Sequence, residues 1–97
     1  MPKPTLNSIG DNIVDFEVGG VAVARVETTK TLYRPPAEEG GDPEPYVEHV
    51  VYEWRAATAE ESEAMGWAPG HLHWAIVARH EDRDEATNEA AALAASA

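Results

Sequence analysis

Segment 12–33, NIVDFEVGGVAVARVETTKTLY, holds the pattern that most restricts how this chain can fold. Before its glycine pair, valine and phenylalanine alternate with aspartate and glutamate, which is the period of two typical of a half-buried strand. Gly19 and Gly20 then supply a two-residue loop that can adopt positive φ, the turn that the twist of paired strands favours. The segment therefore predicts an antiparallel β-hairpin.

The glycine turn also predicts the register of this hairpin. It pairs Val18 with Val21 and Phe16 with Val23, and residues directly opposite share one face of a sheet. We expect the apolar face to belong to the core; its members are Val14, Phe16, Val18, Val21 and Val23. The other face is expected to be acidic and to contact water; it carries Asp15, Glu17, Ala22 and Ala24.

Two segments are expected to lie outside regular structure. Residues 1–11 predict a flexible N-terminal lead because Pro2 and Pro4 lack the amide hydrogen that ladders and helices use. Residues 34–45 hold four of the seven prolines, two of the seven glycines and four acidic residues, which is typical of a loop. We therefore predict one domain over residues 12–97 with a long acidic loop inside it.

Two further strands are predicted. The run YVEHVVYEWRAA, residues 46–57, is rich in aromatic and β-branched residues. One predicted face carries Tyr46, Val50, Tyr52 and Trp54, and the other carries Val47, His49, Val51, Glu53 and Arg55. The run HLHWAIVARH, residues 71–80, places Leu72, Trp74, Ile76 and Ala78 on one face. Because the chain has a single phenylalanine, we expect Trp54 and Trp74 to supply the core.

Two helices are indicated by their end signals. Thr58 followed by Glu61 predicts a capping box, and Gly66 with Trp67 predicts the end of a short helix. Asp82, with Glu85 three residues later, predicts the start of a C-terminal helix. Its inward stripe would be Ala86, Ala90, Leu93 and Ala97. These side chains are mostly small, so residues 90–97 are expected to fray.

Together these signals predict an α+β fold. The expected order is β-β-β-α-β-α, a small single domain with a mainly antiparallel four-stranded sheet, one short helix and one C-terminal helix. A chain of 97 residues is long enough for one modest core.

Composition restricts the compartment and the partners. The chain has no cysteine, no signal-peptide pattern and no apolar run near the ~20 residues of a membrane helix, so we expect a cytoplasmic protein. Its net charge is −11, from 18 acidic against seven basic residues. Direct binding to nucleic acid or to an anionic membrane is disfavoured because the phosphates would be repelled.

The acidic residues are grouped, and the groups are candidate contacts for a basic partner. The first group lies in the predicted loop, the second opens the short helix, and the third lies on the last helix. They comprise Glu38, Glu39, Asp42 and Glu44; Glu60, Glu61 and Glu63; and Asp82, Asp84, Glu85 and Glu89. Trp67 is the tryptophan most expected to be exposed, and it joins this set of partner-binding candidates.

One functional hypothesis follows from these groups. An acidic domain of this size can present about the charge density of one strand of nucleic acid on a single face. It could then block a basic, nucleic-acid-binding surface of a partner protein by charge mimicry. Phage-encoded inhibitors of bacterial defence, such as anti-CRISPR and anti-restriction proteins, are of this type. The analogy rests on charge and size and on no motif.

The alternative hypothesis is a small ligand-binding or metal-dependent domain. His71 and His73 are two apart on a strand and so point to one face, and His49 is available on another strand. Glu53 shares the face of His49, and three imidazoles with this carboxylate would suit zinc or iron if the strands are adjacent. No catalytic signature is complete, so we predict neither an enzyme nor a cofactor.

Overall fold

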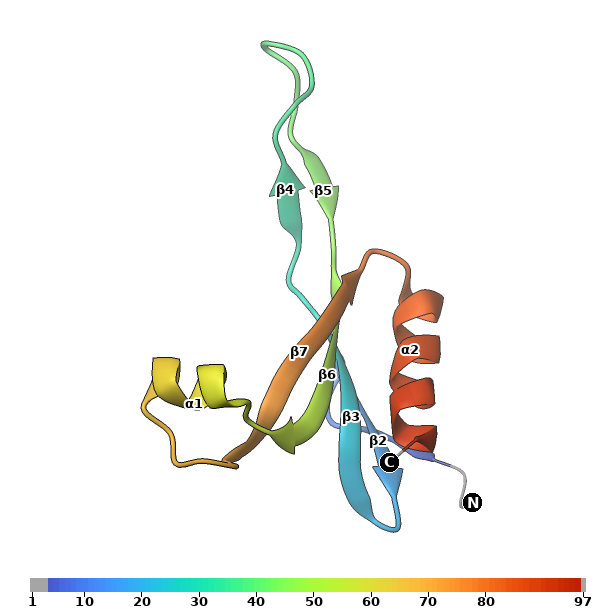
Figure 1. Ribbon diagram of the computed structural model, residues 1–97. Helices are drawn as coiled ribbons and strands as arrows, with labels where there is room; N and C mark the ends of the chain where they lie inside the picture. Colours follow the sequence, from blue (N-terminus) through green and yellow to red (C-terminus); the bar gives the residue numbers. More distant parts are fainter. Residues whose placement is uncertain (1–3, 97) are drawn as a thin grey trace.

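The computed structural model describes residues 4–96 and shows an α+β fold with two sheets (Figure 1). The main sheet has five antiparallel strands in the order β1-β2-β3-β6-β7. These are β1 (Thr5–Ser8), β2 (Ile13–Val18), β3 (Val21–Thr28), β6 (His49–Ala56) and β7 (Leu72–His80). A two-stranded sheet is formed by β4 (Leu32–Arg34) and β5 (Glu44–Tyr46), and the helices are α1 (Ala59–Met65) and α2 (Arg83–Ala95).

The predicted fold class was therefore wrong in its sheet, although the α+β composition is confirmed. The described residues form seven strands, in the order β-β-β-β-β-β-α-β-α, instead of four in the order β-β-β-α-β-α. The additional strand of the main sheet is β1, which comes from the expected N-terminal lead and pairs Leu6 with Phe16. Strand pairing uses backbone groups, so a short polar segment such as TLNS can join a sheet without any hydrophobic pattern.

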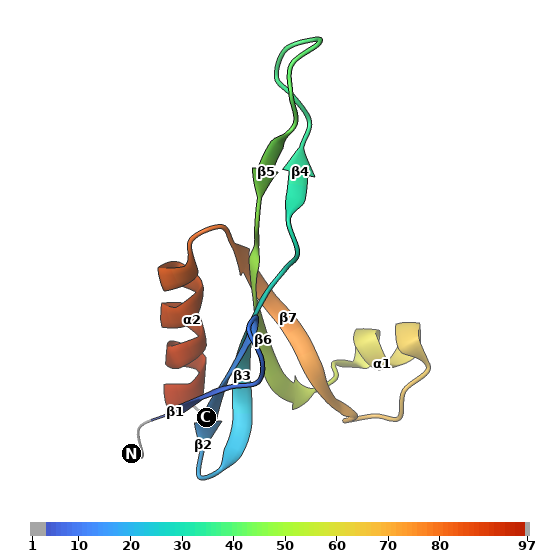
Figure 2. The ribbon, with the colours of Figure 1, turned by 180° about the vertical axis from the view of Figure 1, so that it is seen from behind.

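The predicted acidic loop is a β-hairpin arm. Strands β4 and β5 pair Tyr33 with Pro45, and only residues 35–43 form the connecting loop. The arm extends the β3–β6 pair beyond the main sheet and projects away from both helices (Figure 2). Pro45 is tolerated because a two-stranded ribbon consists of edges, where a missing amide hydrogen costs little.

The first hairpin follows its predicted turn but not its predicted register. Gly19 and Gly20 have φ of 60° and 81°, as a turn of this kind requires. A bulge between residues 16 and 17 then shifts the pairing, so Phe16 lies opposite Ala24 instead of Val23. The extra residue of a bulge moves every later side chain of one strand relative to its partner.

This shift determines which residues form the core. One side of the sheet, which we call the helix side, packs against α2 (Figure 1). The buried cluster between them is Phe16, Ala24, Val26, Val51, Ala86, Ala90 and Ala94. Ala86 and Ala90 confirm the predicted inward stripe, Leu93 is half-buried at its margin, and Ala97 lies outside the described residues. Val21, expected in the core, is 58% exposed.

The opposite side of the sheet, the aromatic side, is not the core that the tryptophans predicted. Trp74 contacts the edge of Trp54, with ring centroids 5.3 Å apart, and Trp54 remains 39% exposed. Arg25 lies 4.4 Å from the centroid of Trp74 and is held by Asp15 through two hydrogen bonds of 2.6 and 3.1 Å. Asp15 is therefore 2% exposed, although its position predicted contact with water. A doubly bonded arginine explains how this carboxylate is buried.

The helix ends follow the sequence signals. Thr58 and Glu61 form the reciprocal capping box of α1, with bonds of 2.9 and 3.1 Å. Gly66 takes the left-handed conformation with φ of 72°, and the Trp67 amide donates to the Ser62 carbonyl oxygen at 2.9 Å. Asp82 caps α2 as predicted. Such bonds involve residues close in sequence, so local patterns are sufficient to predict them.

The tight contact between α2 and the sheet predicts that a larger side chain on the buried face of α2 lowers the stability of the fold. Ala90 is fully buried between α2 and the sheet, whereas Ala92 on the same helix is exposed. We expect Ala90→Leu to lower the free energy of unfolding by about 1–3 kcal/mol because the new side chain would push the helix off the sheet. Ala92→Leu is the matched control and should leave it nearly unchanged. Urea unfolding followed by circular dichroism measures both, and equal effects would contradict the tight packing.

Candidate functional site

The first acidic group lies on the arm. Its four carboxylates, all exposed, surround the end of the β4–β5 hairpin; they are Glu38, Glu39, Asp42 and Glu44. None of them forms an ion pair with another residue in the range 4–96. The arm makes few contacts with the body beyond its base. These charges therefore face solvent from several directions and are available to a partner.

The base of the arm is joined to the start of α2 by an ion pair. Arg34 on β4 donates to Glu81 at 2.7 Å, and its guanidinium lies 4.5 Å from the ring centroid of Tyr46 on β5. The bond to Glu81 raises the pKa of Arg34 above its ordinary value. Because Glu81 immediately precedes α2, this contact holds the arm and the first turn of α2 at the same end of the molecule.

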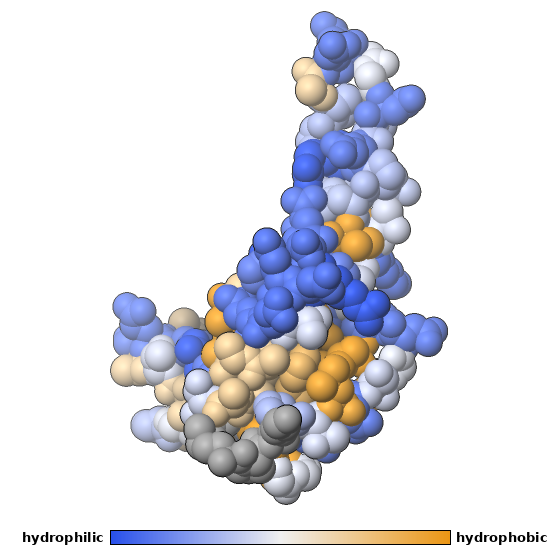
Figure 3. Space-filling view, turned by 90° about the vertical axis from the view of Figure 1, so that its right-hand side faces the viewer, coloured by the Kyte–Doolittle hydropathy of each residue, from blue (hydrophilic) through white to orange (hydrophobic). Residues whose placement is uncertain are grey.

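The third acidic group lies at that same end. Figure 3 shows a continuous hydrophilic surface that runs from the arm onto the region where α2 begins. Asp82 and Asp84 are both exposed there. The sequence could not show that these two groups lie together, since 37 or more residues separate them. We call the surface made by Glu38, Glu39, Asp42, Glu44, Asp82 and Asp84 the acidic end.

Two members of the third group have another partner within the chain. The imidazole of His80, at the end of β7, lies between Glu85 and Glu89. Its Nε2 is 2.9 Å from Glu89 Oε2, and its Nδ1 is 3.6 Å from Glu85 Oε2. The hydrogen bond to Glu89 is the main reason why the pKa of His80 is raised. These two carboxylates therefore hold α2 to β7, and they are poor candidates for contacts with a partner.

The second acidic group is not part of the acidic end. Glu60, Glu61 and Glu63 lie on α1, which stands at the far end of the body from the arm (Figures 1 and 2). Glu61 accepts the hydrogen bond from the Thr58 amide, which is the main cause of its lowered pKa. The structure therefore separates the α1 acids from the other two groups.

The three candidate metal ligands are not brought together. His71 and His73 both lie against Trp67, with ring centroids 4.7 and 4.8 Å apart, so Trp67 is half-buried. His49 is six residues along β6 from the partner of His73, or about 20 Å away. Residues 4–96 contain no group of three potential ligands placed to hold a metal ion.

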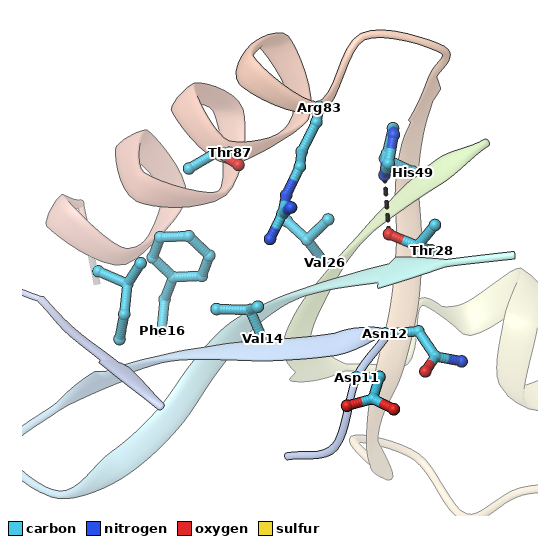
Figure 4. A pocket seen from close by; sticks show the side chains of 10 residues that line it. Asp11, Asn12, Val14, Phe16, Val26, Thr28, His49, Arg83 and Thr87 are labelled. Carbon is cyan, nitrogen blue, oxygen red and sulfur yellow. Dashed lines mark hydrogen bonds between the residues drawn. The ribbon is translucent and has the colours of Figure 1, made fainter. Parts of the chain in front are cut away.

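His49 instead lines a pocket between the sheet and the first half of α2 (Figure 4). The pocket has a volume of about 370 Å³ and an apolar floor that includes Val14, Phe16 and Val26. Its polar lining is Asp11, Asn12, Thr28, His49, Arg83 and Thr87. His49 is 7% exposed, and its Nδ1 lies 2.8 Å from the Thr28 hydroxyl. No local sequence pattern indicates this pocket because its lining comes from β1–β3, β6 and α2.

Arg83 is the unusual member of this lining. Each other arginine has a carboxylate oxygen within 4.0 Å; these are Arg25, Arg34, Arg55 and Arg79. Arg83 forms no such pair with any described residue, and Figure 4 shows it directed from the start of α2 toward Val26. The helix dipole disfavours a cation in the first turn, so helix stability does not account for this arginine.

The raised pKa of His80 predicts a pH-dependent stability. A raised folded-state pKa stabilises the fold fully below the unfolded value of about 6.5, and this stabilisation is lost as pH rises through the folded value. We expect Glu89→Gln to reduce the loss of stability between about pH 6 and pH 8.5. Urea midpoints at both pH values measure the difference. Glu63→Gln, at an exposed position of α1, is the control; the same flattening in both variants would contradict the assignment to His80.

Comparisons with known proteins leave the function to be inferred from this geometry. No protein-family model, no curated protein and no solved structure matches the chain. Within residues 4–96, neither helix has the length and apolar character needed to cross a membrane. The acidic end and the pocket beneath α2 are thus the two features of the molecule that suggest a function.

Proposed function

We propose that this protein is an acidic interaction module that binds a basic surface of a partner protein. The main support for the proposal is the acidic end, where a projecting arm and the first turn of α2 carry exposed carboxylates at one end of the molecule. Figure 3 shows that the surface joining them is hydrophilic. Carboxylates placed in this way attract lysine and arginine over several ångströms and pair with them at contact.

Four of the five arginines pair with carboxylates within the chain, so they do not neutralise the acids of the arm. Arg25 is bound by Asp15, and Arg34 by Glu81. Glu38, Glu39 and Asp42 have no such partner among the residues with assigned structure, whereas Glu44 lies opposite Arg34 in the β4–β5 pair. Their mutual repulsion is relieved when a basic partner replaces water and counterions, and this release favours association at low salt.

The kind of partner follows from the same chemistry. A nucleic-acid-binding protein carries lysines and arginines arranged for successive phosphates. An arm that carries acids on a narrow two-stranded ribbon could enter such a groove and compete with the nucleic acid. We therefore propose competitive occlusion of a nucleic-acid-binding surface, the mode of action of mimics encoded by phages against bacterial defence systems.

Neutralising the arm tests this proposal. The immobilised protein is used to capture basic proteins from a bacterial lysate, and duplex DNA is used to displace them. We expect Glu38→Gln with Glu39→Gln to lower the captured amount by about five- to tenfold, since two charge pairs are lost. Capture by the original protein should fall as salt is raised.

The matched control is Glu60→Gln with Glu63→Gln on α1, which changes the net charge by the same amount at the other end of the molecule. It should leave capture unchanged. If both double variants lost the same amount of capture, the effect would be due to net charge alone and not to the position of the arm. Capture of no protein that DNA displaces would refute the proposal.

A second candidate function is favoured by Arg83. An unpaired guanidinium facing a pocket with an apolar floor is suited to a small organic anion, such as a carboxylate with an aromatic or short aliphatic body. The hydroxyl of Thr87 and the imidazole of His49 line the same space. The volume of about 370 Å³ lies within the range of ligand pockets.

Benzoate is a suitable probe for this site, with benzyl alcohol as its neutral analogue. We expect benzoate to shift the amide resonances of Thr87 and neighbouring residues, and Arg83→Gln to weaken its binding about tenfold because a charge-assisted bond is lost. Arg79→Gln, which removes an arginine paired with Glu48 on the sheet, is the control. Equal binding of benzyl alcohol, or no effect of Arg83→Gln, would exclude an anion site.

A further inference from the structure

Strand β7 is an edge of the main sheet, and its outer side pairs with no other strand of the described chain. It has nine residues, against about five or six in a typical strand. Natural edge strands are usually short or carry charges and prolines, which prevent pairing with another chain. The residues of β7, LHWAIVARH, include no proline and no acidic residue. Such an edge is a template for a further strand.

The side chains beside this edge are apolar and exposed. Leu72, Trp74 and Ile76 alternate along β7 on the aromatic side, and Trp54 of β6 lies opposite Trp74. Leu72 is 55% exposed, Ile76 51% and Trp54 39%. We call Leu72, Trp74, Ile76 and Trp54 the β7 stripe. A monomer would leave Leu72, Ile76 and Trp54 in contact with water, whereas Trp74 is partly covered by Arg25. Exposure of apolar surface is unfavourable by roughly 25 cal/mol for each Å².

Neither helix covers the β7 stripe. Helix α2 packs on the helix side of the sheet, where Val51 lies opposite Ala78. Trp67, which follows α1, contacts His71 and His73, and these alternate with the residues of the stripe and so point to the other side. Neither segment covers the β7 stripe, because α2 and Trp67 both contact the opposite face of the sheet.

The lack of carboxylates in the β7 stripe permits two copies to approach each other there. Each copy has a net charge of −11, so most pairs of surfaces would bring carboxylates together. The β7 stripe contains no carboxylate, and its strand carries only histidine and arginine as titratable groups. Glu61 of α1 lies 3.4 Å from His73, on the other face of the strand, so short-range repulsion at the stripe itself is low. The remaining long-range repulsion is screened by salt.

The surface area of the monomer is large for its mass. The chain exposes 6706 Å², whereas a compact monomer of 10.5 kDa exposes about 5,400 Å². Part of the excess is the arm, which also gives the radius of gyration of 16.3 Å in place of about 12.5 Å. The excess is nevertheless of the same order as the ~800 Å² that each partner buries in a stable complex.

We propose that two copies of this chain associate through β7, with residues 72–76 of each copy paired antiparallel about a two-fold axis near Trp74. Leu72 then lies opposite Ile76 of the second copy on the aromatic side, and the two β7 stripes form one apolar surface. The bulge at residue 77 ends the pairing because it interrupts the alternation of side chains. Such an interface is self-complementary and closed.

This arrangement has a consequence for the acidic ends. The two main sheets join into one continuous sheet, and antiparallel pairing directs the two arms away from each other. The dimer would therefore present its two acidic ends at opposite extremes. The inference does not depend on the proposed partner, because it rests on apolar residues that are remote from the arm.

Sedimentation equilibrium of the full chain, at low and high sodium chloride, tests the dimer. We expect reversible dimerisation that becomes stronger as salt rises, the reverse of the salt dependence of binding to a basic partner. Ile76→Glu should raise the dissociation constant by at least about tenfold, since each dimer loses two buried isoleucines and places each new carboxylate against the apolar Leu72 of the other copy. Its exposed position lets the variant fold, which circular dichroism verifies.

Val21→Glu is the matched control, since Val21 is 58% exposed at the β2–β3 turn and lies outside the β7 stripe. It should leave the dimer intact. A protein that stays monomeric at high concentration and high salt would overturn the proposal. So would a dimer that Ile76→Glu leaves unchanged, or one that Val21→Glu disrupts equally, because the interface would then lie elsewhere.

Discussion

The packing of alanines from α2 against the sheet is the contact on which this fold depends. Ala86, Ala90 and Ala94 are essentially inaccessible to water and let the helix approach Phe16 and Val51 closely. Within residues 4–96 only α2 is long enough to cover the sheet, so only one side is buried in this way. The choice of that side leaves the tryptophans on the other side partly exposed.

The aromatic side is organised by polar contacts in place of a covering layer. Asp15 holds Arg25, and Arg25 in turn lies over Trp74. A buried carboxylate is tolerable because its charge is matched by two bonds from one guanidinium. The contacts from Asp15 to Arg25 and from Arg25 to Trp74 position the Trp74 ring, while Trp54 beside it stays exposed to solvent. Ordered contacts thus hold the exposed aromatic surface in place, which is consistent with the proposed contact between two copies.

The acidic residues divide into those used by the fold and those left for a partner. Glu61 closes the capping box of α1 and Glu89 holds His80, whereas Asp82 both caps α2 and is exposed at the acidic end. The arm carboxylates have no comparable role in the described chain. All 18 acidic residues contribute equally to the net charge. A mutation in the arm changes only exposed charges, whereas a mutation of Glu89 also removes a contact that stabilises the fold.

Sequence patterns alone predicted the features that depend on neighbours in the chain. The turn at Gly19-Gly20 and the caps at Thr58 and Asp82 were predicted because their hydrogen bonds join residues a few positions apart. The strand β1, the bulge after Phe16 and the side chosen by α2 were not, since backbone pairing and the fit of a helix on a sheet carry no local pattern. Tertiary structure alone placed the arm beside the start of α2 and assembled the pocket around His49, because both join segments that lie far apart in the sequence.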